Sequence, residues 1–161
     1  MKDFDMAESC ESYLVPLIQT ESMEFIVDGC QCRRTQKTEN ISDWDIAQKY
    51  LNVCVNSEDG SNYFKCSKCM RTMIPLDAMG KLDKFSDVFN LDVYHKYAFR
   101  NKAFFRANVK RIGFAMDIAD YCDGHSYAMP STFVSKIYLF LRKCGSRMKR
   151  GLRSYNSEER R

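Results

Sequence analysis

Three cysteines between residues 54 and 69 constrain the fold of this chain more than any other feature of its sequence. Cys66 and Cys69 form a C-x2-C pair, and Cys54 precedes the pair across a polar loop, NSEDGSN, that can fold back without burying costly groups. Zinc is bound tetrahedrally, and a C-x2-C turn lets two thiolates reach one ion while backbone N–H groups stabilise their charge. We therefore predict that Cys54, Cys66 and Cys69 are metal ligands, with zinc as the candidate metal.

The position in phase with this pair, where a fourth ligand is expected, holds Tyr63. Tyrosine is a poor zinc ligand because its hydroxyl ionises near pH 10. The fourth ligand is then water, or Cys30 or Cys32 from the preceding turn. In the alternative interpretation, Cys66 and Cys69 bind no metal and pack as small hydrophobic residues.

If zinc is bound, we expect its role to be structural. Arg71 and Thr72 follow the cysteine pair after one methionine. We expect these two side chains to anchor the cysteine site to the following helix and not to act on a substrate.

The chain has 161 residues, of which 45% are hydrophobic, and it can therefore bury one core. We expect one domain, or one domain with an appendage. Eight cysteines occur without an N-terminal apolar run, which predicts reduced thiols and a cytoplasmic location. The longest apolar segment, 133–141, is much shorter than the roughly 20 apolar residues that cross a bilayer. No transmembrane helix and no membrane partner are predicted.

The first part of the chain alternates strand-like and helix-like segments. Residues 23–29 are apolar and end in Asp-Gly, which predicts a short buried strand and a turn. Residues 38–51 place apolar side chains near helical spacing, with Thr38 as candidate N-cap. Residues 51–55 are β-prone. This order is typical of a βαβ unit, although two strands alone do not make a stable sheet.

Helical patterns follow the cysteines. The spacing predicts a helix over 69–82 that Gly80 ends, and a helical stretch over 91–122 that is either continuous or divided at Gly113. A last helix is predicted over 129–145, so that the second half forms a small helical bundle. The other boundary signals are candidate N-caps at Asp92 and at Ser131 or Thr132, and a stop at Gly145.

The pattern C-x8-Y-x2-C-x2-C over residues 54–69 resembles the C-x8-C-x2-C-x2-C zinc knot near the C-terminus of 7-cyano-7-deazaguanine synthase and its ATP-pyrophosphatase relatives, with one cysteine replaced by tyrosine. The segment KTENISDWDIAQKYLNVC (37–54) is similar to the segment that precedes the knot in that family. The run KCSKCMRTMIPLDAMGKLDKFSDVF (65–89) resembles their Cys–Arg–Thr run. The resemblance covers roughly residues 14–90.

The resemblance implies a family that activates a carboxylate with ATP, using an N-terminal Ser-Gly-Gly-x-Asp-Ser phosphate loop. A phosphate cradle needs successive small residues so that backbone N–H groups converge on the anion, and the glycines of this chain are isolated. We therefore interpret the chain as the C-terminal part of such a protein, truncated or one subunit of a split protein. It is not expected to be catalytic alone, and ATP is expected only through a partner subunit that carries the phosphate loop.

Three basic residues follow the first predicted strand. Arg33, Arg34 and Lys37 are candidates to face a nucleotide held by that partner, and the alternative is that they are solvated turn residues. The predicted fold class is α+β and mainly helical. Residues 1–90 are expected to form a short βαβ remnant of an ATP-pyrophosphatase-like domain with the cysteine knot, and residues 91–161 a helical appendage with a basic tail.

A zinc-supported nucleic-acid-binding module is the main alternative function. Residues 94–111 interleave aromatic and basic side chains, as such modules do, and residues 142–161 are rich in Lys and Arg. On a helix, however, the aromatic residues more simply form a core-facing stripe with the basic residues outside. Nucleic acid is therefore not the expected partner. The residues assigned to the core are Tyr97, Phe104, Phe105 and Val109, and those assigned to the outside are Arg100, Lys102, Arg106, Lys110 and Arg111.

Overall fold

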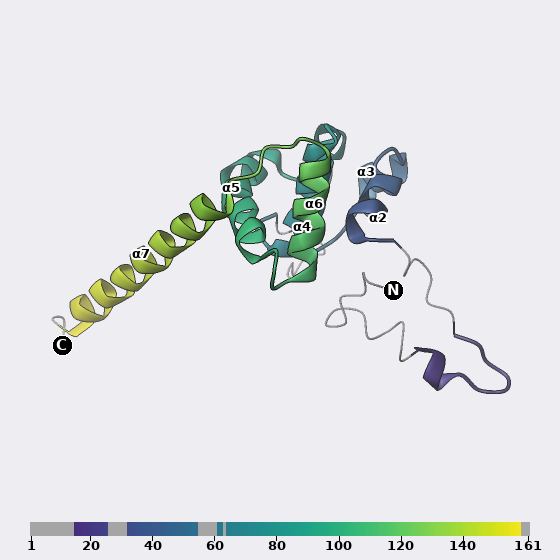
Figure 1. The fold of residues 1–161 in the computed structure, drawn as a ribbon, viewed down its shortest axis with the longest axis horizontal. Coiled ribbons are helices and arrows are strands. Elements are labelled where there is room, and N and C mark those ends of the chain that lie inside the picture. The colour runs from purple at the N-terminus through teal and green to yellow at the C-terminus, as the bar shows by residue number, and fades with distance from the viewer. Residues whose placement is uncertain (1–14, 26–31, 55–60, 63, 159–161) are drawn as a thin grey trace.

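Helices form nearly all of the regular structure in the computed structural model, which describes residues 15–25, 32–54, 61–62 and 64–158 (Figure 1). The prediction of a mainly helical chain is confirmed. In chain order the elements are η1 (Val15–Ile18), α2 (Arg34–Ile41), α3 (Asp45–Tyr50), α4 (Ser67–Ala78), η2 (Leu82–Phe85), α5 (Leu91–Asn108), α6 (Gly113–Gly124) and α7 (Thr132–Glu158).

The predicted βαβ unit is not observed, because the residues that the structure describes contain no β-strand. Residues 51–54 have no regular structure. Met23 makes one isolated antiparallel bridge with Thr20, and residues 26–29 of the predicted first strand and residue 55 of the second lie outside the described residues. Two short strands with no further partners leave most of their hydrogen-bonding groups unpaired, which makes such a sheet unstable.

The side chain of Asn62 supplies the hydrogen bonds that a strand would have supplied to residues 51–53. Its Oδ1 accepts from Val53 N at 3.0 Å, and its Nδ2 donates to Leu51 O at 2.9 Å and to Val88 O at 3.0 Å. Asn62 is buried, so its amide must find partners within the protein. One buried amide therefore holds the extended segment before Cys54 against the segment before α5.

The single helix predicted over residues 38–51 is instead two short helices, α2 and α3. Thr38 is not the N-cap: it lies inside α2, and its hydroxyl donates to Arg34 O at 3.0 Å. The break follows from Ser42, whose hydroxyl donates to Glu39 O at 2.6 Å and whose own carbonyl accepts from Gln48 Nε2 at 3.0 Å. Serine competes for backbone partners in this way and so favours helix ends.

Both ends of α4 have capping interactions. Its N-cap is Cys66, whose sulfur accepts from Cys69 N. At the other end Gly80 has a positive φ of 68°, Gly80 N donates to Asp77 O, and Lys81 N donates to Leu76 O. This is a Schellman motif, which needs the left-handed conformation that glycine adopts at low cost. The predicted end of the helix at Gly80 is confirmed.

The stretch predicted over 91–122 forms two helices, α5 and α6, and α6 begins at Gly113. Of the two predicted alternatives, this is the one divided at Gly113. The predicted cap is wrong: Asn90, not Asp92, accepts from Val93 N at 3.0 Å. Asp92 lies in the first turn, where a carboxylate still favours the positive end of the helix dipole.

The last helix, α7, begins after Ser131, whose hydroxyl accepts from Val134 N at 3.3 Å. It continues through Gly145 to Glu158, so the predicted stop at Gly145 is wrong. Glycine inside a helix costs only about 1 kcal/mol relative to alanine, and the neighbouring residues are good helix formers. No helix in the described residues combines the length and apolar character needed to cross a membrane.

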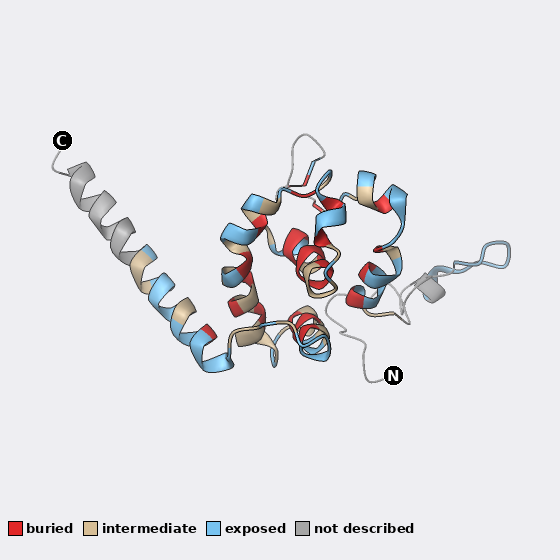
Figure 2. Cartoon of the chain, turned by 90° about the horizontal axis from the view of Figure 1, so that it is seen from above, coloured by how far each residue is buried: buried red, intermediate tan, exposed pale blue. Residues whose placement is uncertain are grey.

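A single cluster of buried hydrophobic side chains joins the helices (Figure 2). α4 lies at its centre and packs against α2, α5 and α6. Met73 of α4 and Phe105 of α5 are fully buried members of the same cluster, so the core includes residues on both sides of the boundary predicted at residue 90. The division into two domains and the helical bundle of residues 91–161 stay predictions.

A carboxylate of α6 caps α2 from outside that helix. Asp117 accepts from Thr35 N at 3.2 Å and from the Thr35 hydroxyl at 2.7 Å, and Thr35 is buried. We expect Asp117→Ala to lower the free energy of unfolding by about 1–2 kcal/mol, as loss of an N-cap does, in urea unfolding. The matched control is Asp120→Ala, which removes an exposed 3.4 Å ion pair with Arg33 and should cost less than about 1 kcal/mol. Equal effects of the two variants would contradict the capping role.

Candidate metal centre

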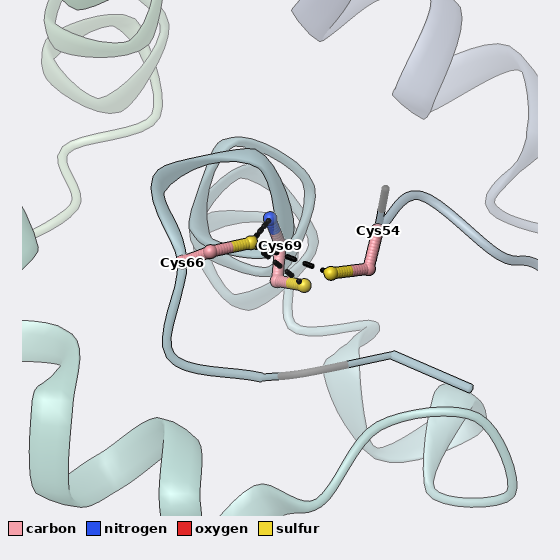
Figure 3. Close-up of side chains that lie close together, drawn as sticks. All are labelled: Cys54, Cys66 and Cys69. Atoms are coloured by element: carbon pink, nitrogen blue, oxygen red, sulfur yellow. Dashed lines mark hydrogen bonds between the residues drawn. The ribbon is translucent and has the colours of Figure 1, made fainter. Parts of the chain in front are cut away.

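The three predicted cysteines come together in the structure (Figure 3). The sulfur of Cys66 lies 3.7 Å from that of Cys54 and 3.4 Å from that of Cys69. All three sulfur atoms lie within 4.8 Å of one another. Cys69 is fully buried, Cys54 is nearly so, and Cys66 is half-buried. The sequence prediction that these three residues share one site is therefore consistent with the geometry.

Two elements position the three sulfurs. Cys66 and Cys69 lie on either side of the start of α4, so that Cys69 N donates to the Cys66 sulfur at 3.4 Å. Phe64, just before the pair, has a positive φ of 63°, an uncommon conformation for a residue with a side chain. This turn brings the chain into α4. Cys54 approaches from the segment that Asn62 holds in place, and Figure 3 shows the three side chains pointing toward one another.

The spacing of the sulfurs fits a tetrahedral zinc ion. Zn–S bonds of about 2.3 Å at tetrahedral angles place two sulfur atoms roughly 3.8 Å apart, close to the distances observed here. The three cysteines are free thiols. Three thiolate donors are soft ligands that favour zinc over magnesium or calcium.

Burial makes this cluster unfavourable for thiolates without a cation. It raises the pKa of the Cys69 thiol, and the neighbouring Cys66 thiol acts in the same direction. A bound divalent cation reverses this preference because it stabilises the deprotonated ligands. The site therefore favours a thiolate at Cys69 only when a cation is bound.

The source of a fourth ligand is partly constrained. Cys32, one of the predicted candidates, lies in the described part of the chain and does not belong to the cluster. The other two positions, Cys30 and Tyr63, lie outside the described residues. Water is the remaining alternative from the sequence.

Arg71 and Thr72, expected to anchor the site, lie on the buried side of α4. The guanidinium carbon of Arg71 lies 3.2 Å from the centre of the Phe114 ring on α6, a cation–π contact. Thr72 is buried. Arg71 therefore connects the helix that carries the cysteine pair to α6.

The three predicted nucleotide-facing residues lie at the start of α2, away from the cysteine cluster in sequence. Arg34 and Lys37 are exposed. Arg33 pairs with Asp120 of α6 at 3.4 Å. Their role toward a nucleotide stays a prediction.

A second polar cluster, which the sequence analysis missed, links α4, α5 and the segment after α6. Tyr94 donates to the Asp77 carboxylate at 2.6 Å and lies 3.2 Å from the hydroxyl of Tyr127. Tyr127 also donates to Asp77 and accepts from Lys102. The prediction that Lys102 lies on the outside of this helix is therefore wrong. The sequence spacing could have indicated this contact, since Tyr94 and Lys102 are eight residues apart and so share one helix face.

This cluster borders Cys122, a fully buried thiol. Burial raises the pKa of Cys122 to about 11. An unfolded thiol ionises near pH 8.5, so this group contributes stability that is present below about pH 8.5 and lost as the pH rises toward about 11. We expect wild type to lose more stability between pH 8 and pH 10 than Cys122→Ala does in urea unfolding. The same loss in both proteins would contradict this role.

Neither histidine belongs to the cysteine cluster, and the His95 ring meets the Tyr94 ring of the polar cluster edge-on at 5.3 Å. His95 is exposed on α5, and His125 is exposed and stacks on Tyr121 at a ring distance of 4.1 Å. Together with the position of the cysteines, this leaves the thiol cluster as the candidate metal centre in the described part of the chain.

Three comparisons with known proteins find no similar protein. No family model matches the chain. Neither the curated proteins nor the solved structures include a significant match.

Proposed function

We propose that this chain is a non-catalytic helical module whose fold is stabilised by a structural zinc ion bound to Cys54, Cys66 and Cys69. The observation that carries the proposal is the convergence of the three sulfur atoms within 4.8 Å. Zinc would tie the start of α4 to the segment that ends at Cys54. Such a cross-link stabilises a fold because the site does not exist in the unfolded chain.

A structural role is favoured over a catalytic one by the surroundings of the sulfurs. In the described residues no histidine or carboxylate belongs to the cluster. A catalytic zinc ion activates a water molecule, and nearby acid–base groups then move its protons. Cys54 and Cys69 also belong to the hydrophobic core, where a stable cross-link is of use and substrate access is poor.

The test is the metal content of protein purified under reducing conditions without chelator. Elemental analysis should find one zinc ion per chain, and Cys66→Ser should lose it. Cys144→Ser is the matched control, since Cys144 is a half-buried free thiol on α7, outside the cluster, and it should keep the metal. A folded wild-type protein without metal would contradict the proposal and favour cysteines packed as small hydrophobic residues.

A subunit of a carboxylate-activating enzyme resembling the 7-cyano-7-deazaguanine synthase-like proteins is the more specific form of this proposal. It is supported by the cysteine spacing and the Cys–Arg–Thr run. In this form, ATP is bound by a partner with a phosphate loop, and Arg33, Arg34 and Lys37 approach it. Substituting all three with Ala should then weaken ATP turnover by the assembled pair without changing the zinc content.

Nucleic-acid binding through α5 is disfavoured because several of its basic side chains bond to other groups of the protein. Arg100 donates to Lys65 O at 3.0 Å, Arg106 pairs with Asp123, and Lys102 belongs to the Tyr127 cluster. Phe105 is fully buried. A helix that reads nucleic acid needs free basic groups and exposed rings, so the zinc-supported nucleic-acid module remains the weaker alternative.

A further inference from the structure

One helix of this protein has an apolar face that the other described residues do not cover. Four large apolar side chains lie on one side of α7, because they are spaced by four, three and one residues along the helix. They are Phe133, Ile137, Phe140 and Leu141. Phe133 is 74% exposed, Phe140 66% and Leu141 62%. Figure 2 shows most of the described part of this helix as exposed. Large apolar side chains gathered on one exposed face mark an interaction site.

The contact between α7 and α5 uses a different side of the helix. Ser135 is fully buried, and the Tyr138 ring meets the Phe99 ring of α5 edge-on, with their centres 5.1 Å apart. Ser135 and Tyr138 are three residues apart and face away from the side that carries Phe133 and Ile137. Beyond this contact α7 extends away from the other helices (Figure 1). Packing within the described chain therefore leaves the apolar face free.

The charges of α7 indicate what covers this face. Lys136, Arg142 and Lys143 of α7 are exposed, and the sequence of α7 contains no acidic residue before Glu158. Pairing of α7 with a second copy would bring like charges together, which costs free energy. The charge is instead complementary to an anionic surface.

We propose that α7 binds an anionic lipid surface, lying in the plane of the headgroups with its apolar face inserted. A helix with phenylalanine and leucine on one side, lysine and arginine on the other and a large free length behaves in this way. Anionic headgroups attract each nearby Lys or Arg, and the inserted rings supply the apolar contribution. The 27 residues of α7 span roughly 40 Å at 1.5 Å per residue, and α5 holds only one end. This departs from the prediction of no membrane partner, which considered only helices that cross a bilayer.

The experiment is co-sedimentation of the full chain with vesicles of phosphatidylcholine mixed with phosphatidylserine, and with vesicles of phosphatidylcholine alone. We expect binding to the anionic vesicles and at least about tenfold weaker binding to the neutral ones. Phe140→Ser combined with Leu141→Ser should weaken binding about tenfold or more, as should Arg142→Glu combined with Lys143→Glu. Tyr50→Ser is the matched control, because Tyr50 is 77% exposed on α3, and it should bind as wild type does.

Three results would overturn the proposal, provided that circular dichroism shows each variant to be folded. Equal binding to neutral and anionic vesicles would show that charge does not select the surface. The second result is that the protein does not bind vesicles and is a dimer, and that Phe140→Ser combined with Leu141→Ser makes it monomeric. This would show that a second copy covers the face. The third result is that the protein does not bind vesicles but that α7 binds tightly to an acidic helix-binding protein such as calmodulin. This would assign the face to a protein partner.

Discussion

Removal of zinc by a chelator should lower the thermal unfolding midpoint of this protein by about 10 °C or more. A ligand present at a thousand times its dissociation constant stabilises the native state by about 4 kcal/mol, and a domain of this size shifts by roughly 2–4 °C per kcal/mol. The effect should be large because Cys54 and Cys69 belong to the same hydrophobic cluster as α4 and α5. Calorimetry before and after chelation, with zinc added back, measures it.

Variants separate loss of the metal from loss of packing. Cys69→Ser should unfold at the midpoint of the chelated wild type and should not respond to added zinc, whereas Cys144→Ser should respond fully. If chelation leaves the midpoint of wild type unchanged while the protein contains zinc, the ion does not support the fold and the structural role is wrong.

Replacement of Phe105 by alanine should lower the free energy of unfolding by about 3–5 kcal/mol, the range for a buried phenylalanine. Phe105 is fully buried, and its ring meets Phe114 of α6 edge-on at 6.0 Å. Phe99→Ala is the matched control on the same helix, because Phe99 is 48% exposed and its ring forms a T-shaped pair with Tyr138. Its replacement should cost about 1 kcal/mol. Urea unfolding at one pH compares the two, and equal losses would contradict the burial argument.

The same experiment tests the division of the chain at residue 90. The core cluster contains Met73 before that position and Phe105 after it. If the two parts share one core, Phe105→Ala should shift a single cooperative transition that every probe reports alike. Two separate transitions, of which only one moves, would support the predicted two-domain organisation instead.

Features of this structure that depend on neighbouring residues could be predicted from the sequence. The end of α4 at Gly80 and the start of α6 at Gly113 follow from glycine's conformational freedom and from local apolar spacing. The cysteine cluster followed from C-x2-C geometry together with a polar loop. For the two helix ends the determining atoms lie within about one or two helical turns in sequence, where spacing rules apply. The three cysteines lie no more than 15 residues apart.

What could not be predicted depends on contacts between distant residues. Asn62 bonds to Val88, and Asp117 caps α2 at Thr35, and no local pattern reveals either partner. The βαβ unit is not observed in the described residues for a related reason, since Leu51 and Val53 bond to a side-chain amide and not to a neighbouring strand. Lys102 was misplaced because a charged residue was assumed to face solvent, although its ammonium group donates to the half-buried Tyr127 hydroxyl.

The clamp formed by Asn62 has a consequence for how the sequence can diverge. The side chain of Asn62 bonds to residues 51, 53 and 88, so the two ends of the segment from Cys54 to Asn62 are held together by protein atoms as well as by any metal. The entropy of closing a loop grows slowly, by about 0.6 kcal/mol for each doubling of its length. Insertions between Cys54 and Asn62 should therefore be tolerated. In homologues of this chain we expect the asparagine and the C-x2-C pair to be kept, while the number of residues between Cys54 and Asn62 varies.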